Sequence, residues 1–207
     1  MKHLAEKIVI YQINQGIITN DEKENYIYAY FILMEQTINT FIAFSIGIIT
    51  GNVIYVISFL ISYIWLRTFG GGYHARTVQQ CCISSIGIII LICVIKNYNF
   101  INEKLLDILL SMCNIIIFLL APIESKNKLL NQKEKRRNHR NTIITLILEE
   151  LVMICLMYLG KKEIYLGIKT AILIFTVFLV IGKKINNTER DEKLWIQKII
   201  QIGRAHV

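Results

Sequence analysis

The sequence lacks the motifs of several familiar classes. No C-x-x-C pair occurs among its five cysteines, and their odd number argues against a disulfide framework. His74, Cys81 and Cys82 offer too few ligands at awkward spacing, so we expect no metal site. No ATP-binding motif, no basic–aromatic RNA-binding motif and no acidic metal-binding motif of phosphatidyl-transfer enzymes is present. We therefore expect no cofactor and no nucleic-acid partner.

Residues 1–20 also lack a continuous apolar core with a small-residue cleavage site, so a cleavable signal peptide is not expected. Apolar residues are otherwise abundant. The 207 residues are 54% hydrophobic, include one proline and have a mean hydropathy of +0.49. This is too apolar for one soluble domain and long enough for several membrane spans. The net charge of +8 arises from basic residues beside apolar segments, which is typical of a membrane protein in contact with lipid.

The hydropathy pattern predicts an all-α fold, a polytopic membrane helical bundle forming one membrane domain over residues 1–207. We expect about six spans, some short enough to be re-entrant, at residues 26–50, 53–66, 82–95, 105–121, 142–159 and 164–182. Residues 1–18 place Leu4, Ile8 and Tyr11 at helical spacing. This segment is either an amphipathic helix at the membrane surface or a helix that packs against the spans. A polar tail with a second apolar stripe occupies residues 183–207.

Basic residues are divided unevenly among the segments that join these spans. If both termini lie inside, the inner segments hold eighteen lysines and arginines, seven of them in a basic loop over residues 123–141. The outer loops hold only Lys96, Lys104, Lys161 and Lys162. The positive-inside rule therefore predicts a multi-pass protein with both termini on the cytoplasmic side.

A polar strip, residues 67–81, separates the second and third spans. On one straight helix His74 and Cys81 would lie about 10 Å apart along the axis, whereas a nucleophile and its base need about 3 Å. Gly70–Gly72 permit a turn, and the Thr77–Gln80 capping box predicts a helix from Thr77. Cys81 then lies in the first helical turn, where free amides and the helix dipole favour a thiolate. A glycine-rich turn with a chance histidine and cysteine explains the same residues without catalysis.

Acidic residues inside the expected spans suggest further interpretations. Glu35 either faces the bundle, where it could orient His74 or bind substrate, or lies at the membrane interface. Glu149 and Glu150 resemble a glutamate-type membrane protease pattern, but the expected following arginine is missing. These three glutamates and Lys169 could instead line a polar path, so a non-catalytic peptide transporter or scaffold is the alternative function.

The strip resembles that of the AgrB-type quorum-sensing propeptide-processing endopeptidases of low-GC Gram-positive bacteria. The shared features are Arg67, the Gly71–Gly72 pair, and His74 followed by Cys81 seven residues later. Ala121-Pro122 with the following Asn127-Lys128 is similar to the family's proline and basic loop. The resemblance implies that Cys81 is the nucleophile and His74 the general base, with Arg67, Gly71 and Gly72 supporting the site. It also implies a location in the bacterial cytoplasmic membrane, with the active site facing the cytoplasm.

The resemblance further implies a substrate, an AgrD-type propeptide with an acidic C-terminal tail. Such an enzyme cuts the tail from the signal core, holds the core as a cysteine thioester and releases it as a cyclic thiolactone or lactone. The basic loop would attract the tail through Lys126, Lys128, Arg136 and Arg137, although such runs also bind anionic lipid headgroups. The identity of the ring, export of the product and a homodimer stay open.

Overall fold

The structure, a computed structural model, describes residues 2–72, 78–98, 103–123 and 131–205; side chains at 78, 79, 81, 103 and 187–205 lie outside the description. Its helices are α1 (Lys2–Asn14), the short 3₁₀ helix η1 (Asn20–Glu22), α2 (Lys23–Ile49), α3 (Val53–Gly70), α4 (Val78–Asn97), α5 (Glu103–Leu120), α6 (Gln132–Tyr158) and α7 (Lys162–Ala205). The described residues contain no β-strand beyond one isolated bridge, which confirms the all-α prediction.

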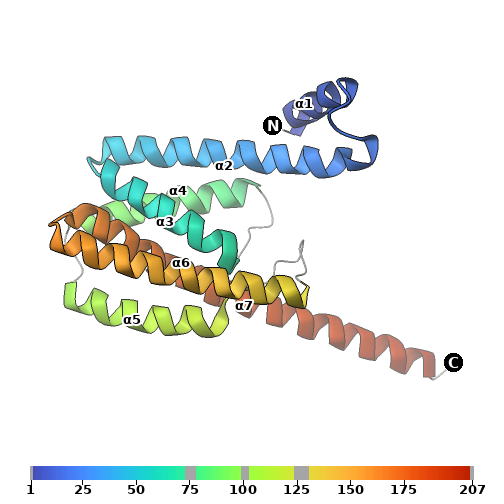
Figure 1. Cartoon of the computed structure of the whole chain (residues 1–207). Coiled ribbons are helices and arrows are strands. Elements are labelled where there is room, and N and C mark those ends of the chain that lie inside the picture. The colour runs from blue at the N-terminus through green and yellow to red at the C-terminus, as the bar shows by residue number, and fades with distance from the viewer. Residues whose placement is uncertain (1, 73–77, 99–102, 124–130, 206–207) are drawn as a thin grey trace.

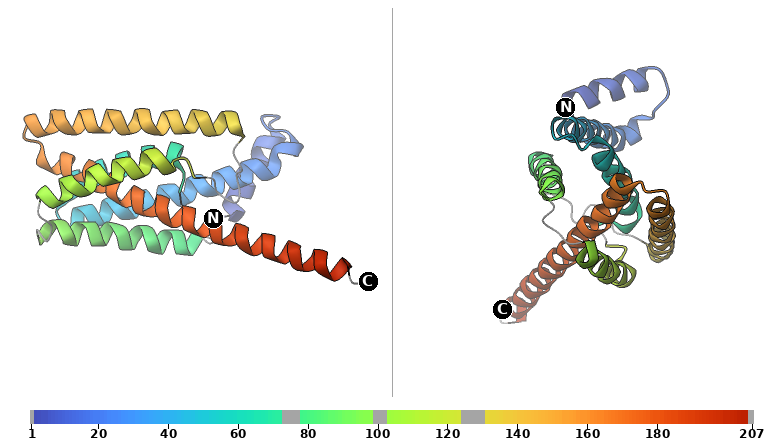
Figure 2. Two further views of the ribbon diagram at one scale, coloured as in Figure 1. Left: turned by 90° about the horizontal axis from the view of Figure 1, so that it is seen from below. Right: turned by 90° about the vertical axis from the view of Figure 1, so that its left-hand side faces the viewer.

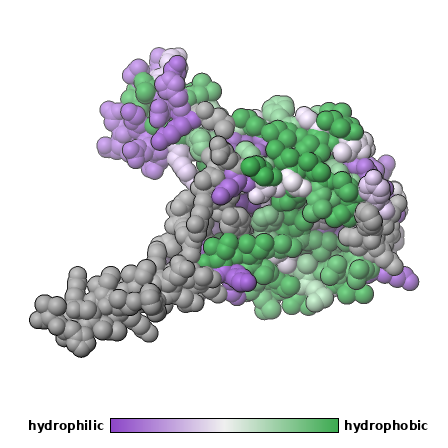
Figure 3. Space-filling model, turned by 180° about the vertical axis from the view of Figure 1, so that it is seen from behind, coloured by the Kyte–Doolittle hydropathy of each residue, from purple (hydrophilic) through white to green (hydrophobic). Residues whose placement is uncertain are grey.

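Four of the described helical segments are long and apolar enough to cross a membrane: Asn20–Ile49, Val53–Gly70, Gln132–Tyr158 and Lys162–Asn186. Within α4, Cys82–Asn97 forms a shorter apolar helix. The six expected spans correspond to α2 through α7. A broad hydrophobic surface covers the bundle, whereas the projecting N-terminal region is largely hydrophilic (Figure 3). The prediction of a helical membrane bundle is therefore confirmed.

Helices α2 to α7 alternate in direction (Figure 1). As a result, α3 and α5 end at the same end of the bundle at which α4 and α6 begin. We call this the strip end, because the described part of the polar strip lies there. The turns from α2 to α3 and from α6 to α7 lie at the opposite, far end.

The core is built around α3 and α7, which pack against each other; α7 also contacts α5 and α6 (Figure 2). One buried cluster joins α3 and α7 to α5 and α6 and includes Leu66, Ile117 and Phe175. A second cluster joins α3 and α7 to α2 and α4 and includes Phe59 and Ile92. Both clusters therefore depend on the same two central helices.

Polar contacts hold the helices together near the far end of the bundle. The Lys96 ammonium on α4 donates to Asn52 Oδ1 and to Glu163 Oε1, both at 2.7 Å. On α7, Lys169 is only 1% exposed, and its ammonium lies 2.5 Å from Asp107 Oδ1 of α5. Buried charges of this kind require a partner in the membrane interior. These contacts therefore stabilise the register of the spans.

The N-terminal helix α1 packs on α2 through a face other than the predicted stripe. Ala5 and Val9 are fully buried, and Gln12 Nε2 donates to the Tyr30 hydroxyl at 2.7 Å. Leu4 and Tyr11 of the predicted stripe remain exposed. The structure therefore gives a packing helix whose outer apolar face stays available to a membrane surface.

Two helix boundaries differ from the expected segment bounds. The basic segment 123–141 is not wholly a loop, since α6 begins at Gln132 behind a capping box formed by Asn131 and Glu134. The tail 183–207 does not begin a new segment, because α7 continues without interruption to Ala205. A glycine within a helical pattern, here Gly182, lowers helix stability but does not end the helix.

Candidate functional site

Arg67 lies in the last turn of α3, beside an aromatic stack. Its Nη1 donates to the Tyr63 hydroxyl at 2.6 Å, and its guanidinium carbon lies 5.7 Å from the Tyr63 ring centroid. Tyr63 stacks on Phe59 at 5.6 Å and meets the edge of Phe178 on α7 at 6.4 Å. Because the ring of Tyr63 is held on two sides, its hydroxyl orients the guanidinium at the strip end.

Gly71 and Gly72 form the turn that ends α3. The Gly71 amide donates to the Arg67 carbonyl oxygen at 3.1 Å, and the two glycines have φ values of +68° and +113°. These angles favour glycine. A Cβ atom on Gly71 would also overlap the carbonyl oxygen of Ile123, whereas one on Gly72 would meet Phe178 O at an ordinary 3.6 Å. The backbone of Gly71 therefore lies directly against another segment.

That segment is Ala121-Pro122-Ile123, which follows α5. The Ile123 amide donates to the Gly70 carbonyl oxygen at 3.0 Å, and Gly71 and Ile123 form a parallel bridge. The structure thus brings together the two stretches on which the family resemblance rests. Sequence reasoning did not predict this contact, nor the role of His139, whose Nδ1 lies 2.6 Å from the Ala121 carbonyl oxygen. No sequence signal singles out His139 within the basic segment.

Cys81 occupies the position predicted for it in the backbone. Helix α4 begins at Val78, so Cys81 is its fourth residue and lies in the first turn. The Cys81 side chain and the whole of His74 lie outside the described residues, as does the predicted cap at Thr77. The catalytic pairing of Cys81 with His74 therefore stays a prediction. The neighbouring Cys82 is a half-buried free thiol.

The remaining candidate residues are divided among several elements. Glu35 lies on α2 and is only 8% exposed, so within the described structure it faces the bundle. Arg136 and Arg137 are exposed in the first turns of α6, at the strip end. Lys126 and Lys128 lie outside the described residues. Arg67, Gly71 and Gly72 are therefore the predicted site residues that the structure brings together.

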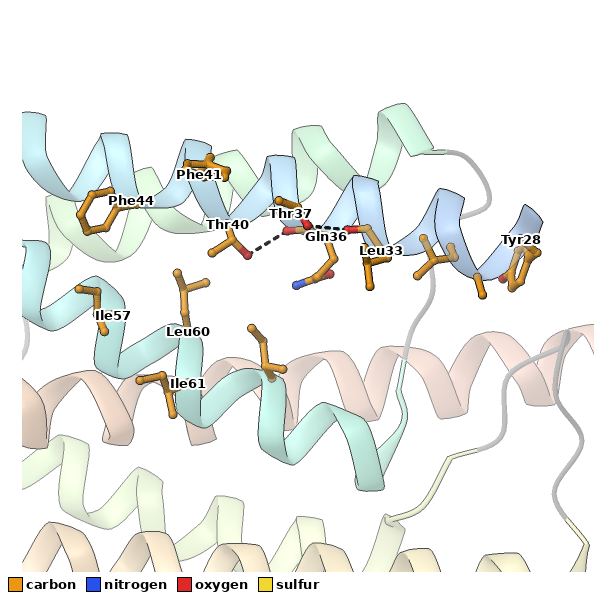
Figure 4. Close-up of a pocket in the computed structure, with 13 residues that line it drawn as sticks. Tyr28, Leu33, Gln36, Thr37, Thr40, Phe41, Phe44, Ile57, Leu60 and Ile61 are labelled. Atoms are coloured by element: carbon orange, nitrogen blue, oxygen red, sulfur yellow. Dashed lines mark hydrogen bonds between the residues drawn. The ribbon is translucent and has the colours of Figure 1, made fainter. Parts of the chain in front are cut away.

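A groove of about 940 Å³ lies between α2 and α3 (Figure 4). Its lining is almost entirely apolar, with side chains such as Phe41, Leu60 and Ile61. The hydroxyls of Thr37 and Thr40 bond to carbonyl oxygens of their own helix at 2.8 and 2.9 Å. Its described lining includes none of Arg67, Gly71 and Gly72, and such a lining suits hydrocarbon better than chemistry.

The described residues contain no group of three or more His, Cys, Asp and Glu side chains that could hold a metal ion. The cysteines whose side chains are described, Cys82, Cys93, Cys113 and Cys155, are free thiols.

The long apolar helices, the buried Lys169 paired with Asp107 and the hydrophobic exterior define an integral membrane protein of the all-helical class. Comparison with family models then assigns it more narrowly: residues 3–182 match the model of Accessory gene regulator B, and the chain belongs to the AgrB family. Membership associates it with the processing of quorum-sensing peptides.

Individual relatives support the same assignment. The chain is 27% identical over 155 residues to an AgrB-like protein of Clostridium perfringens, covering 68% of this chain and 72% of that protein. It is 26% identical over 172 residues to an AgrB-like protein of Listeria innocua and 27% identical to one of Listeria welshimeri, covering 78% of each chain. No solved structure matches the chain.

Proposed function

We propose that this protein is a cysteine endopeptidase of the cytoplasmic membrane that cleaves and cyclises an AgrD-type propeptide. The observation that carries the proposal is the position of Cys81 in the first turn of α4, at the same end of the bundle as Arg67 and the Gly71–Gly72 turn. Helix N-termini favour anions, and the thiolate is the reactive form of cysteine. Family membership supports the same chemistry.

The reaction proceeds in two acyl transfers. His74 takes the thiol proton of Cys81, and the resulting thiolate attacks the scissile carbonyl of the propeptide. The C–N bond breaks, the proton passes to the leaving amine, and the acidic tail departs while the core stays attached as a thioester. A thiol or hydroxyl of the core then attacks this thioester and closes the ring, which regenerates the Cys81 thiol.

The oxyanion formed in each step needs hydrogen-bond donors. The amide groups at the start of α4 and those of the Gly71–Gly72 turn are the candidates from the described structure. Exchange of one thioester for another is nearly isoenergetic, so cyclisation needs no nucleotide. Thioester formation from an amide is uphill, and removal of the released tail drives it. A site at the membrane boundary also limits hydrolysis of the thioester.

The basic first turns of α6 are the proposed contact for the acidic tail. Arg136 and Arg137 are exposed there, and Glu134 is the acid among them. Their concentration at the strip end supports a cytoplasmic location for this end. Lys126 and Lys128 complete the proposed surface. Reversing these four charges, with correct membrane insertion verified, should abolish binding of the tail; unchanged processing would remove this role and leave lipid contact.

The central test is propeptide processing by the protein reconstituted in lipid vesicles. We expect Cys81→Ala and His74→Ala each to abolish release of the tail, measured by mass spectrometry. Cys82→Ala should retain most of the activity, because a neighbouring helical residue points about 100° away. Cys155→Ala, which changes an exposed thiol on α6, is the matched control.

Trapping separates this enzyme from a carrier. Hydroxylamine should release the core from the wild-type protein but find no thioester in Cys81→Ala. Alkylation of Cys81 should stop cleavage of the propeptide. A transporter or scaffold would not cleave the propeptide even before alkylation. Tail release by Cys81→Ala would refute the mechanism.

A further inference from the structure

Glu149 of α6 is a buried acid that the proposed reaction does not use. It is 6% exposed, and neither of its carboxyl oxygens has a hydrogen-bond partner among the described residues. Its polar neighbour is the hydroxyl of Ser62 on α3, which is 4% exposed; the two groups lie close enough to interact but form no hydrogen bond of good geometry. Two buried polar groups without a well-formed hydrogen bond therefore lie next to each other between α3 and α6.

The surroundings of Glu149 are those of a membrane interior. Leu146 and Met153, one turn to either side on α6, are both buried in the cluster shared with α3, α5 and α7. Nine residues separate Glu149 from the end of α6 at Tyr158, about 13 Å along the axis. The hydrocarbon core of a bilayer is about 30 Å thick, so Glu149 lies well inside it.

Two cations on the neighbouring helices already have partners. Lys169 of α7 is bound to Asp107 of α5, and Arg67 of α3 donates to the Tyr63 hydroxyl. Among titratable groups, Glu150 is the acid next to Glu149, and it accepts a hydrogen bond from Asn114 of α5 at 2.5 Å. The described structure therefore offers Glu149 no cation, and places a second carboxyl group beside it.

An ionised carboxylate buried without a partner is far more costly than a neutral acid. We propose that Glu149 is an intramembrane proton-binding site, held as a neutral acid that donates its proton to the Ser62 hydroxyl and so joins α6 to α3. Protonation removes the charge of the carboxyl group and gives it an O–H that can donate to the Ser62 hydroxyl. The ligand of this site is a proton, and the site does not depend on the proposed peptidase activity.

The site has a consequence for the strip end. Ser62 lies five residues before Arg67 on α3, about 7.5 Å along the axis. A contact at Ser62 therefore holds the part of α3 that carries Arg67 and the glycine turn against α6. Loss of the proton would leave a charge between the two helices and weaken this contact.

The test is infrared spectroscopy of the full chain in vesicles of phosphatidylcholine and phosphatidylglycerol at pH 7. Spectra in H₂O and in D₂O are compared for the wild type and each variant. We expect a C=O stretch of a protonated carboxyl group that shifts in D₂O and is lost in Glu149→Gln. Glu150→Gln, its neighbour on the same helix, is the matched control and should retain the band. Dicyclohexylcarbodiimide, which adds to protonated carboxyl groups in lipid, should give one adduct at Glu149 that Glu149→Gln lacks.

Ser62→Ala keeps the test decisive if Glu149→Gln does not fold. In Ser62→Ala the protonated-carboxyl band should remain but move to higher frequency, because Glu149 loses the hydroxyl that accepts its hydrogen bond. The proposal is overturned if folded wild-type protein shows no protonated-carboxyl band at pH 7, or if Ser62→Ala leaves the band in place. Loss of the band in Glu150→Gln but not in Glu149→Gln would show that Glu150 holds the proton, and would also overturn the proposal.

Discussion

Replacing Gly71 by alanine tests the contact between the two stretches that carry the family resemblance. Gly71 has φ = +68°, and a Cβ atom there would overlap the carbonyl oxygen of Ile123. The carbonyl oxygen belongs to the backbone, so it cannot move aside as a flexible side chain would. Alanine must therefore both adopt an unfavourable conformation and push the Ile123 segment away.

The two costs can be estimated separately. A left-handed conformation costs a residue with a Cβ atom about 1–2 kcal/mol. Displacing Ile123 also breaks its 3.0 Å hydrogen bond to the Gly70 carbonyl oxygen, which adds about 1 kcal/mol. We expect Gly71→Ala to destabilise the fold by about 2–3 kcal/mol in total.

Two other glycines provide matched controls. Gly51 also has a positive φ, +71°, but has nothing within 4 Å of a built Cβ atom, so Gly51→Ala should show only the first cost, about 1–2 kcal/mol. Gly87 lies in α4 with open space and ordinary helical geometry, so Gly87→Ala should stabilise by about 0.5–1 kcal/mol.

The assay is thermal unfolding of the purified variants in detergent, with propeptide processing measured in parallel. For a chain of this length each kcal/mol shifts Tm by about 2–4 °C. The expected order of Tm is Gly87→Ala, wild type, Gly51→Ala and Gly71→Ala, with processing lost most strongly in the last. If Gly71→Ala is as stable as Gly51→Ala, the Ile123 contact contributes nothing and the reasoning is refuted.

Two further predictions concern contacts of charged residues. Tyr63→Phe keeps the ring beside Arg67 but removes the hydroxyl that accepts its hydrogen bond. We expect thermal unfolding to show a loss of stability of about 1.5 kcal/mol, and propeptide processing to be reduced. Processing equal to that of the wild type would show that catalysis does not need this orientation of Arg67. Lys169→Met leaves Asp107 without its ammonium partner and should lower Tm. Adding Asp107→Asn to this variant should restore part of the lost Tm, because the two residues act as a coupled pair. A double mutant less stable than Lys169→Met would contradict this coupling.

The sequence predicted the start of α4 well because its signal is local. The Thr77–Gln80 pattern placed a helix start at this point, and the structure begins α4 at Val78, with Cys81 in the first turn. The start of α6 had an equally local signal in Asn131 and Glu134. It was missed because the many charged residues that follow are also typical of a solvated loop.

The contact between Gly71 and Ile123 could not be predicted in the same way. The two residues are separated by α4 and α5, and their bridge joins backbone atoms, which leave no pattern of side chains in the sequence. Burial of Glu149 against Ser62 similarly depends on how α6 rotates against α3. The pairing of Cys81 with His74 and the roles of Lys126 and Lys128 stay predictions.

The shared position of α7 in both hydrophobic clusters has a consequence for biosynthesis. Since α7 leaves the ribosome after α2 to α6, neither cluster can close until α7 has been made. Until then Asp107 of α5 must enter the membrane without Lys169. Nascent chains halted before α7 should accordingly be held by insertion factors or degraded, and completion of α7 should be the step that commits the bundle to its native form.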